Sequence, residues 1–373
     1  MDVVEKLNLL AQDAQYDLAC ACGTKNSDDH RKRGADGNWL YPVTVPGGGS
    51  GILLKTLVTN ACTSDCKYCP LRLNGKSRRV SLIPDKLAAF FIDLCRRKNL
   101  IGIFLSSGLL DHPDKSMQLL IDTASILRYK YRYRGYIHTK IIPGASTESI
   151  IKAVSLSSAV SLNIETPGET YFSKLSSRKK YLTDIIEPLK LLSSLTDKHS
   201  KYKRVKTSTQ FIVGASDEPD QEIVKYMWGL YDRLNLNRIY FSAYQKGLGH
   251  PEIPGELYVP ESPDNIFVRE HRLYQSDFLM RSYGFTYQDF MFGSGGNLDL
   301  SKDPKQQWAD SHPEFYPVSI KRSSKEELLR VPGLGPVIVK RIVKYRKSTP
   351  LSSLDSIKMP KHLLQKASPY IML

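Results

Sequence analysis

Three cysteines at close spacing are the residues of this chain best suited to metal chemistry. They are Cys62, Cys66 and Cys69, in the order C-x3-C-x2-C. Iron–sulfur cubes are usually held by four cysteine thiolates, so three can hold three irons of a 4Fe–4S cluster and leave the fourth iron open to another ligand. The alternative is a structural zinc site whose fourth ligand is Cys20, Cys22 or a histidine. Zinc ligands of this kind normally come as two paired sets, and the spacing therefore favours the cluster.

A second segment with a chemical signature lies near the C-terminus, at 326–347. Its pattern predicts a helix ending at Arg330, a turn of sequence Pro-Gly-Leu-Gly and a second helix from Pro336. Gly333 and Gly335 would let the backbone approach a phosphate, which the free amides at the start of the second helix can bind. The bases that would lie beside the phosphate are Lys340, Arg341 and Lys344. The segment resembles the helix-hairpin-helix of sequence-independent DNA binders, and an ordinary helical hairpin is the alternative.

Polar side chains also recur near the ends of apolar runs. Ser161, Asn163 and Glu165 alternate onto one face of the run 159–165, and three polar groups on a buried strand need partners, so we expect them to line a cavity. Candidates for substrate binding or proton transfer, each at or just past a strand end, are His138, Lys140 and Tyr244. A structural role is the alternative for the histidine.

The elements that must position these residues alternate between short apolar runs and amphipathic stretches. The runs, which predict strands, are 51–58, 100–106, 135–141, 159–165, 207–213 and 238–243. Helical spacing of apolar residues predicts helices near 83–97, 115–128, 147–156, 181–195 and 219–234. Such alternation implies a parallel sheet, and six units fall short of a closed eight-stranded barrel. The predicted fold class is therefore α/β, a partial (βα)6 barrel, with its site at the carboxyl ends of the strands.

Three regions are expected along the chain. Residues 1–50 form an N-terminal helix over 1–20 and a polar cap segment, residues 51–318 form the barrel with a C-terminal extension, and residues 319–373 form a small all-α hairpin domain that binds nucleic acid. The apolar side of the first helix is expected to be Val4, Leu7, Leu10 and Ala11.

Charge and composition indicate the setting of the protein. The net charge is +15, and residues 319–373 hold twelve Lys and Arg against three Asp and Glu. Such a surface suits phosphate backbones, although a solvated lysine-rich surface is an equally open interpretation. The chain has no run of ~18 apolar residues and no signal-peptide pattern at its start. Six cysteines, three of them clustered, favour a reducing compartment, so we expect a cytoplasmic protein with no membrane partner.

The cysteine segment, with the aromatic Tyr68 before its third cysteine, resembles the radical S-adenosylmethionine (SAM) superfamily. The resemblance implies the same partial barrel, a 4Fe–4S cluster and SAM as cofactors, and a 5′-deoxyadenosyl radical that abstracts hydrogen from a substrate. It also implies cosubstrate contacts from Tyr68, Ser106, Ser107, Gly108, Ser161, Asn163, Glu165, Gln210 and Gly214. Residues 106–108 depart from the superfamily's Gly-Gly-Glu-like turn because they lack its acidic residue.

With its hairpin tail, the chain resembles the radical SAM proteins of DNA modification or repair whose genes often neighbour one for a uracil-DNA-glycosylase-like protein. That resemblance implies a nucleic acid substrate, DNA favoured over tRNA, an electron donor such as flavodoxin or ferredoxin, and the glycosylase-like protein as a partner. The target nucleotide must then be extruded or single-stranded. Segment 39–46 lacks the cysteine and histidine expected from relatives. Alternatives are a tRNA-modifying radical enzyme, a radical enzyme acting on a small molecule or peptide, and a DNA-binding protein with a structural cluster.

Overall fold

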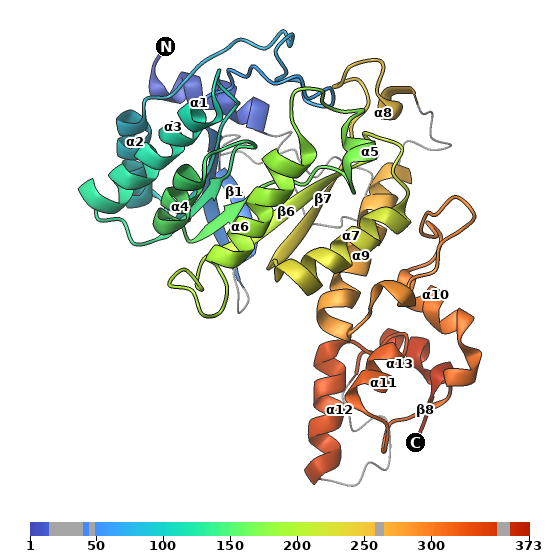
Figure 1. The fold of residues 1–373 in the computed structure, drawn as a ribbon. Helices are drawn as coiled ribbons and strands as arrows, with labels where there is room; N and C mark the ends of the chain where they lie inside the picture. The colour runs from blue at the N-terminus through green and yellow to red at the C-terminus, as the bar shows by residue number, and fades with distance from the viewer. Residues whose placement is uncertain (15–39, 45–48, 258–264, 349–358) are drawn as a thin grey trace. The chain divides into compact units, whose positions relative to one another are not determined.

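The chain folds into two compact units. The computed structural model describes residues 1–14, 40–44, 49–257, 265–348 and 359–373. The first unit comprises Met1–Glu218 and Gly229–Ile266, and the second comprises Pro219–Trp228 and Phe267–Leu373 (Figure 1). The domain boundary expected between residues 318 and 319 falls inside the second unit. No helix among the described residues is both long and apolar enough to cross a lipid bilayer.

The first unit is built on a curled sheet whose strands follow chain order from β1 to β7. Within the described residues its strands are β1 (Leu40–Thr44), β2 (Ser50–Leu57), β3 (Leu100–Ser106), β4 (Tyr136–Lys140), β5 (Ala159–Ser161), β6 (Lys206–Val213) and β7 (Arg238–Ala243). Strands β2 to β7 pair in parallel, and β1 pairs antiparallel with β2. The expected α/β partial barrel is confirmed, as a mixed sheet with one added strand.

Two strands differ from the prediction. Strand β1 lies in the segment expected to be a polar loop, and its Pro42 has no amide to donate, which an edge strand tolerates. Strand β5 ends at Ser161 instead of residue 165 because the Thr209 hydroxyl enters the ladder. It donates to the Leu162 carbonyl at 2.7 Å and accepts from the Ile164 amide at 2.9 Å. Parallel pairing resumes at Glu165, opposite Phe211.

Helices cover one face of this sheet. The described helices that belong wholly to the first unit are α1 (Val3–Ala14), α2 (Pro84–Arg97), α3 (Pro113–Ser125), η2 (Ile126–Lys130), α4 (Thr147–Leu156), α5 (Glu169–Phe172), η3 (Tyr181–Ile186), α6 (Glu187–Leu195) and α8 (Pro254–Leu257). Helices α2, α3, α4 and α6 lie side by side on that face (Figure 1). In α1, Leu7 and Leu10 are fully buried as expected, whereas Val4 is exposed, so the predicted apolar side was wrong at that residue.

The second unit is mostly helical. Two helices cross its boundaries in the sequence: α7 (Asp220–Leu234) is divided between residues 228 and 229, and α9 (Asn265–Tyr283) between residues 266 and 267. The other described elements are η4 (Tyr287–Asp289), α10 (Pro304–Ser311), η5 (Pro313–Phe315), β8 (Val318–Ser319), α11 (Lys325–Arg330), α12 (Pro336–Ser348), α13 (Lys361–Ala367), η7 (Ser368–Tyr370) and β9 (Ile371–Met372). Strands β8 and β9 pair in parallel, a small departure from the expected all-α region.

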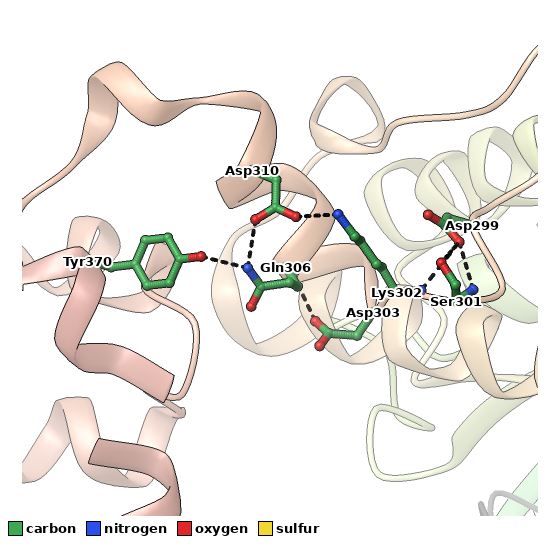
Figure 2. Close-up of polar contacts among 7 residues, drawn as sticks. All are labelled: Asp299, Ser301, Lys302, Asp303, Gln306, Asp310 and Tyr370. Carbon is green, nitrogen blue, oxygen red and sulfur yellow. Dashed lines mark hydrogen bonds and ion pairs between the residues drawn. The ribbon is translucent and has the colours of Figure 1, made fainter. Parts of the chain in front are cut away.

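The C-terminal end of the chain is fixed to α10 by side-chain hydrogen bonds. Gln306 on α10 donates to the Tyr370 hydroxyl at 2.7 Å and to Asp310 at 2.8 Å, and Asp310 is paired with Lys302 (Figure 2). The apolar side chains of α11, α12 and α13 pack into one cluster with Val318 and Ile320. The helical hairpin therefore has a hydrophobic core of its own.

Candidate active site

A pocket opens at the carboxyl ends of the parallel strands in the first unit. It holds about 1160 Å³ of empty space, counting the part open to solvent. Of the residues predicted for the site, those that line it are Cys62, Cys66, Tyr68, Cys69, Ser106, Ser107, Gly108, Lys140, Asn163, Glu165, Gln210 and Tyr244. The barrel therefore brings most of the predicted cluster, cosubstrate and catalytic residues to one cavity.

The cysteine segment is held against the end of β3. The amide of Thr63 donates to the Leu109 carbonyl at 2.7 Å, and the amide of Gly108 donates to the Thr59 carbonyl at 2.7 Å. A Cβ at Gly108 would stand 2.3 Å from the carbonyl oxygen of Ala61. Glycine is therefore required at this position because the cysteine segment passes directly over it.

The three thiols are close enough to affect one another. Burial raises the pKa of the Cys69 thiol to about 12, and Cys66 and Cys62 add to the rise. The Cys66 sulfur also lies 3.1 Å from the Ser64 hydroxyl. A thiolate at Cys69 therefore needs a compensating positive charge, which iron ions supply.

Three thiolates are the donor set that an iron–sulfur cluster takes, and a zinc ion also binds thiolates. Among the described residues, no three or more His, Cys, Asp or Glu side chains converge on one point, as a mononuclear site requires. Thiolates of a 4Fe–4S cube bind different irons and need not converge. Cys20 and Cys22, the alternative zinc ligands, lie outside the described residues. The thiolate chemistry of the three pocket cysteines suits three irons of such a cluster.

Glu165 connects the cysteine segment to the sheet. Its carboxylate accepts a hydrogen bond from the Tyr68 hydroxyl at 2.8 Å and one from the Asn163 amide at 3.4 Å. Its backbone has φ 65°, a left-handed conformation that is uncommon for a residue with a side chain and occurs often at functional sites. Burial and the nearby Glu165 carboxylate raise the pKa of the Tyr68 hydroxyl, which is therefore a neutral donor.

Lys179 is a pocket residue that the sequence did not reveal. Its ammonium is hydrogen-bonded to Cys66 and attracted by the Glu165 carboxylate. Burial acts to lower its pKa, but Cys66, Glu165 and Cys62 together outweigh burial and raise it. The residue lies in the polar run Ser176-Ser-Arg-Lys-Lys180, which has the composition of an ordinary surface loop and follows no strand directly. No signal in the sequence distinguished it from the adjacent bases.

Lys140 and Tyr244 reach the pocket, from the end of β4 and from just after β7. The Tyr244 hydroxyl donates to Glu256, which also accepts from the amides of Gly247 at 2.9 Å and Gly249 at 3.1 Å. Burial and Glu256 together raise the pKa of Tyr244. The phenol is therefore a neutral group that also organises the loop after β7.

Three predicted residues do not line the pocket. His138 lies two residues before Lys140 on β4. Its Nε2 is 2.9 Å from the Ser161 hydroxyl, and its ring centre is 4.3 Å from that of Phe104. The Ser161 hydroxyl therefore contacts His138 inside the barrel. Gly214 has φ 84° in the turn after β6, where its amide donates to Glu218 at 2.7 Å. In this arrangement His138 and Ser161 support the barrel interior, and Gly214 forms a turn.

The C-terminal hairpin has the predicted order of helix, glycine turn and helix. Gly333 has φ 84°, and a Cβ there would meet the Leu363 carbonyl at 2.6 Å, so packing on α13 accounts for this glycine. A Cβ at Gly335 would lie 3.3 Å from the Tyr283 hydroxyl. The bases predicted to lie beside a phosphate, all exposed on α12, are Lys340, Arg341 and Lys344. Val337, 71% exposed, belongs to the same helical stripe.

Comparisons with known proteins give similarity to solved structures only. No protein-family model matches the chain, and no curated protein matches it. Methylornithine synthase (PylB) is 12% identical with a TM-score of 0.44, over 60% of this chain and 62% of that one. The FeFe-hydrogenase maturase HydG from Carboxydothermus hydrogenoformans is 12% identical with a TM-score of 0.46, over 61% and 51%.

A third similar structure is the radical SAM methyltransferase TsrM from Kitasatospora setae, solved with tryptophan and a SAM analogue. It is 14% identical with a TM-score of 0.41, over 55% of this chain and 38% of that one. In all three cases the match spans less than two thirds of the other protein's length. The similarity to these three structures therefore concerns part of the fold.

Proposed function

We propose that this chain is a radical SAM enzyme whose Cys62, Cys66 and Cys69 hold a 4Fe–4S cluster. The observation that carries the proposal is that these cysteines share one pocket with Tyr68 and Glu165, at the strand ends where the fold places active sites. The bound, reduced cluster would supply the electron that cleaves SAM to methionine and a 5′-deoxyadenosyl radical. The protein contributes binding, orientation and exclusion of water.

Around the cysteines, the chain offers groups of the right chemistry for the cosubstrate. Glu165 and Asn163 are buried polar groups suited to hydroxyl partners such as those of a ribose. The Lys179 ammonium is a cation suited to a carboxylate. Gln210 and Ser106 add buried polar atoms from β6 and β3. Ser106 and Gln210 are held by strands of the barrel, whereas Lys179 lies in the loop between α5 and η3.

A nucleic acid, with DNA favoured over tRNA, is the proposed substrate. The net charge of +15 and the exposed bases Lys340, Arg341 and Lys344 on α12 support it, because clustered bases bind phosphates by releasing counterions. The target nucleotide would have to leave its stack or be single-stranded to enter a pocket of this kind. A flavodoxin- or ferredoxin-like electron donor and a uracil-DNA-glycosylase-like partner belong to the same proposal.

The test is anaerobic reconstitution with iron and sulfide, followed by incubation with dithionite and SAM. We expect 5′-deoxyadenosine by chromatography, and an altered nucleoside by mass spectrometry when single-stranded DNA is added. Parallel reactions contain duplex DNA, tRNA or no polynucleotide. An altered nucleoside only in tRNA would transfer the proposal to tRNA. SAM cleavage that no polynucleotide affects would contradict the nucleic acid substrate, and a protein that loads no cluster would contradict the radical SAM assignment.

A further inference from the structure

The cysteine segment is joined to the loop of residues 175–180, here called the lysine arm. Asp65, between the first and second cysteines, accepts the Ser176 hydroxyl at 2.5 Å with one carboxylate oxygen. Its other oxygen accepts the Ser177 hydroxyl at 2.6 Å, the Ser177 amide at 2.8 Å and the Arg178 amide at 3.2 Å. Both carboxylate oxygens therefore bind the lysine arm.

Two further hydrogen bonds join the same two segments. The Arg178 guanidinium donates to the Thr63 carbonyl at 2.8 Å, and the Lys67 amide donates to the Leu175 carbonyl at 2.7 Å. These bonds flank Asp65 on the cysteine segment and flank Ser176 on the lysine arm. The two segments are thus held in one register.

The register matters because the arm ends in three consecutive bases, Arg178, Lys179 and Lys180. Arg178 is exposed and turned to the Thr63 carbonyl, and Lys180 is exposed with its amide bonded to Asp184 at 2.8 Å. Lys179 alone of the three lines the pocket, against Cys66 and Glu165. A shift of one residue would replace this cation by a neighbour.

We propose that Asp65 is a positioning residue for Lys179. It fixes the register of the lysine arm on the cysteine segment, so that the Lys179 ammonium forms the cationic side of the pocket. Because the same segment carries the cluster ligands, order in the cysteine segment and a complete cosubstrate site are coupled. The inference deepens the proposed function and rests on it for the identity of the anion, a carboxylate-bearing cosubstrate.

The first test uses the protein without cluster or cosubstrate. Asp65→Asn keeps one carbonyl acceptor and loses the other, so the amides of Ser177 and Arg178 lose their charged partner. We expect their hydrogen exchange, and tryptic cleavage after residues 178–180, to accelerate about tenfold or more, as loss of a hydrogen bond to a charged group predicts. The matched control is Asp217→Asn, which frees Lys174 just before the arm without touching the cysteine segment. Equal rates in wild type and Asp65→Asn would overturn the inference.

The second test is a double-mutant cycle on anaerobically reconstituted protein, with SAM affinity measured by equilibrium dialysis and cluster content by iron and sulfide analysis. We expect Asp65→Asn and Lys179→Met each to weaken SAM binding about tenfold, and the double variant to bind no worse than Lys179→Met, because coupled residues are not additive. Full additivity would contradict a role of Asp65 through Lys179.

The tests separate the two proposals. If wild-type protein loads no cluster or binds no SAM, the proposed function fails, while the exchange measurement on unloaded protein still decides whether Asp65 orders the arm. If wild type and Asp65→Asn bind SAM equally, the positioning role fails and the proposed function stands. Ser177→Ala removes a single hydroxyl donor and should give a smaller effect in the same direction, so the inference remains testable if Asp65→Asn loads poorly.

Discussion

At the residue scale, the described cysteines fall into two environments. Cys62, Cys66 and Cys69 line the pocket, whereas Cys95 lies on α2 away from it, where burial raises the pKa of its thiol to about 11. Burial also raises the pKa of the Cys69 thiol, to about 12, so the two environments differ in their position relative to the pocket and not in the direction of the pKa shift. Cys95 therefore serves as a control position outside the pocket for substitutions of the three pocket cysteines.

We expect Cys66→Ala to abolish cluster loading and SAM cleavage, because two thiolates cannot hold three irons of the cube. Cys95→Ala makes the same chemical change outside the pocket and should load normally. The measurement is iron and sulfide content with the absorbance of the reconstituted protein. An active Cys66→Ala variant without cluster would contradict the assignment.

Gly108 offers a test of the contact between β3 and the cysteine segment. In Gly108→Ala the new methyl would overlap the Ala61 carbonyl, so we expect a loss of about 1–3 kcal/mol in the free energy of unfolding and reduced iron content. Gly229→Ala in α7, where nothing lies within 4 Å, should instead gain about 0.5–1 kcal/mol. Urea unfolding and iron analysis distinguish the two, and equal behaviour would show that the contact is unimportant.

At the element scale, periodicity predicted the parallel strands and the helices between them because apolar spacing alone defines such elements. The run 100–106 matches β3, and 238–243 matches β7. Strand β1 could not be predicted because a five-residue edge strand containing proline depends on pairing with β2. The early end of β5 depends on the Thr209 hydroxyl, and the position of Lys179 depends on Asp65; both are contacts between segments distant in sequence.

A buried lysine contacts the glycine turn of the hairpin. The Lys305 ammonium donates to the Leu334 carbonyl in the glycine turn at 2.6 Å and lies 4.6 Å from the Tyr283 ring centre. Burial lowers the pKa of Lys305 to about 7, and nearby Lys366 and Arg330 contribute, against the opposing effect of Asp303. The charged form is therefore disfavoured in the folded state.

The stability of the second unit should consequently rise with pH above about 7. Between this pKa and the unfolded value of 10.5, the unfolded chain binds a proton that the folded chain lacks. The free energy of unfolding therefore increases by up to ~1.4 kcal/mol per pH unit in this range. Below about pH 7 the lysine is protonated in both states, so the gain is absent. Lys305→Met should flatten the profile of unfolding midpoints from about pH 7 to about pH 9. Lys302→Met, at an exposed neighbour, should not. A wild-type profile with no rise would contradict the lowered pKa of Lys305.

At the scale of the whole molecule, the pocket of the proposed radical chemistry and the bases proposed to bind the polynucleotide belong to different units. The pocket is formed entirely by residues of the first unit, and the exposed bases of α12 belong to the second. Substrate capture and cosubstrate cleavage should therefore respond to different substitutions. A substitution that weakens polynucleotide binding should leave SAM cleavage without polynucleotide unchanged.

The salt dependence of binding tests this division. Each lost phosphate contact lowers the magnitude of the slope of log K against log salt by about 0.9 on duplex DNA and about 0.7 on single strands. We therefore expect the double variant Lys340→Ala, Lys344→Ala to reduce this slope by about 2 or less and to weaken binding uniformly across sequences. Lys201→Ala with Lys203→Ala removes the same charge from an exposed turn of the first unit and should change the slope little. Fluorescence anisotropy with labelled DNA and tRNA at several salt concentrations gives the slopes. Equal effects of the two pairs would mean that net charge, and not the hairpin, binds the polynucleotide.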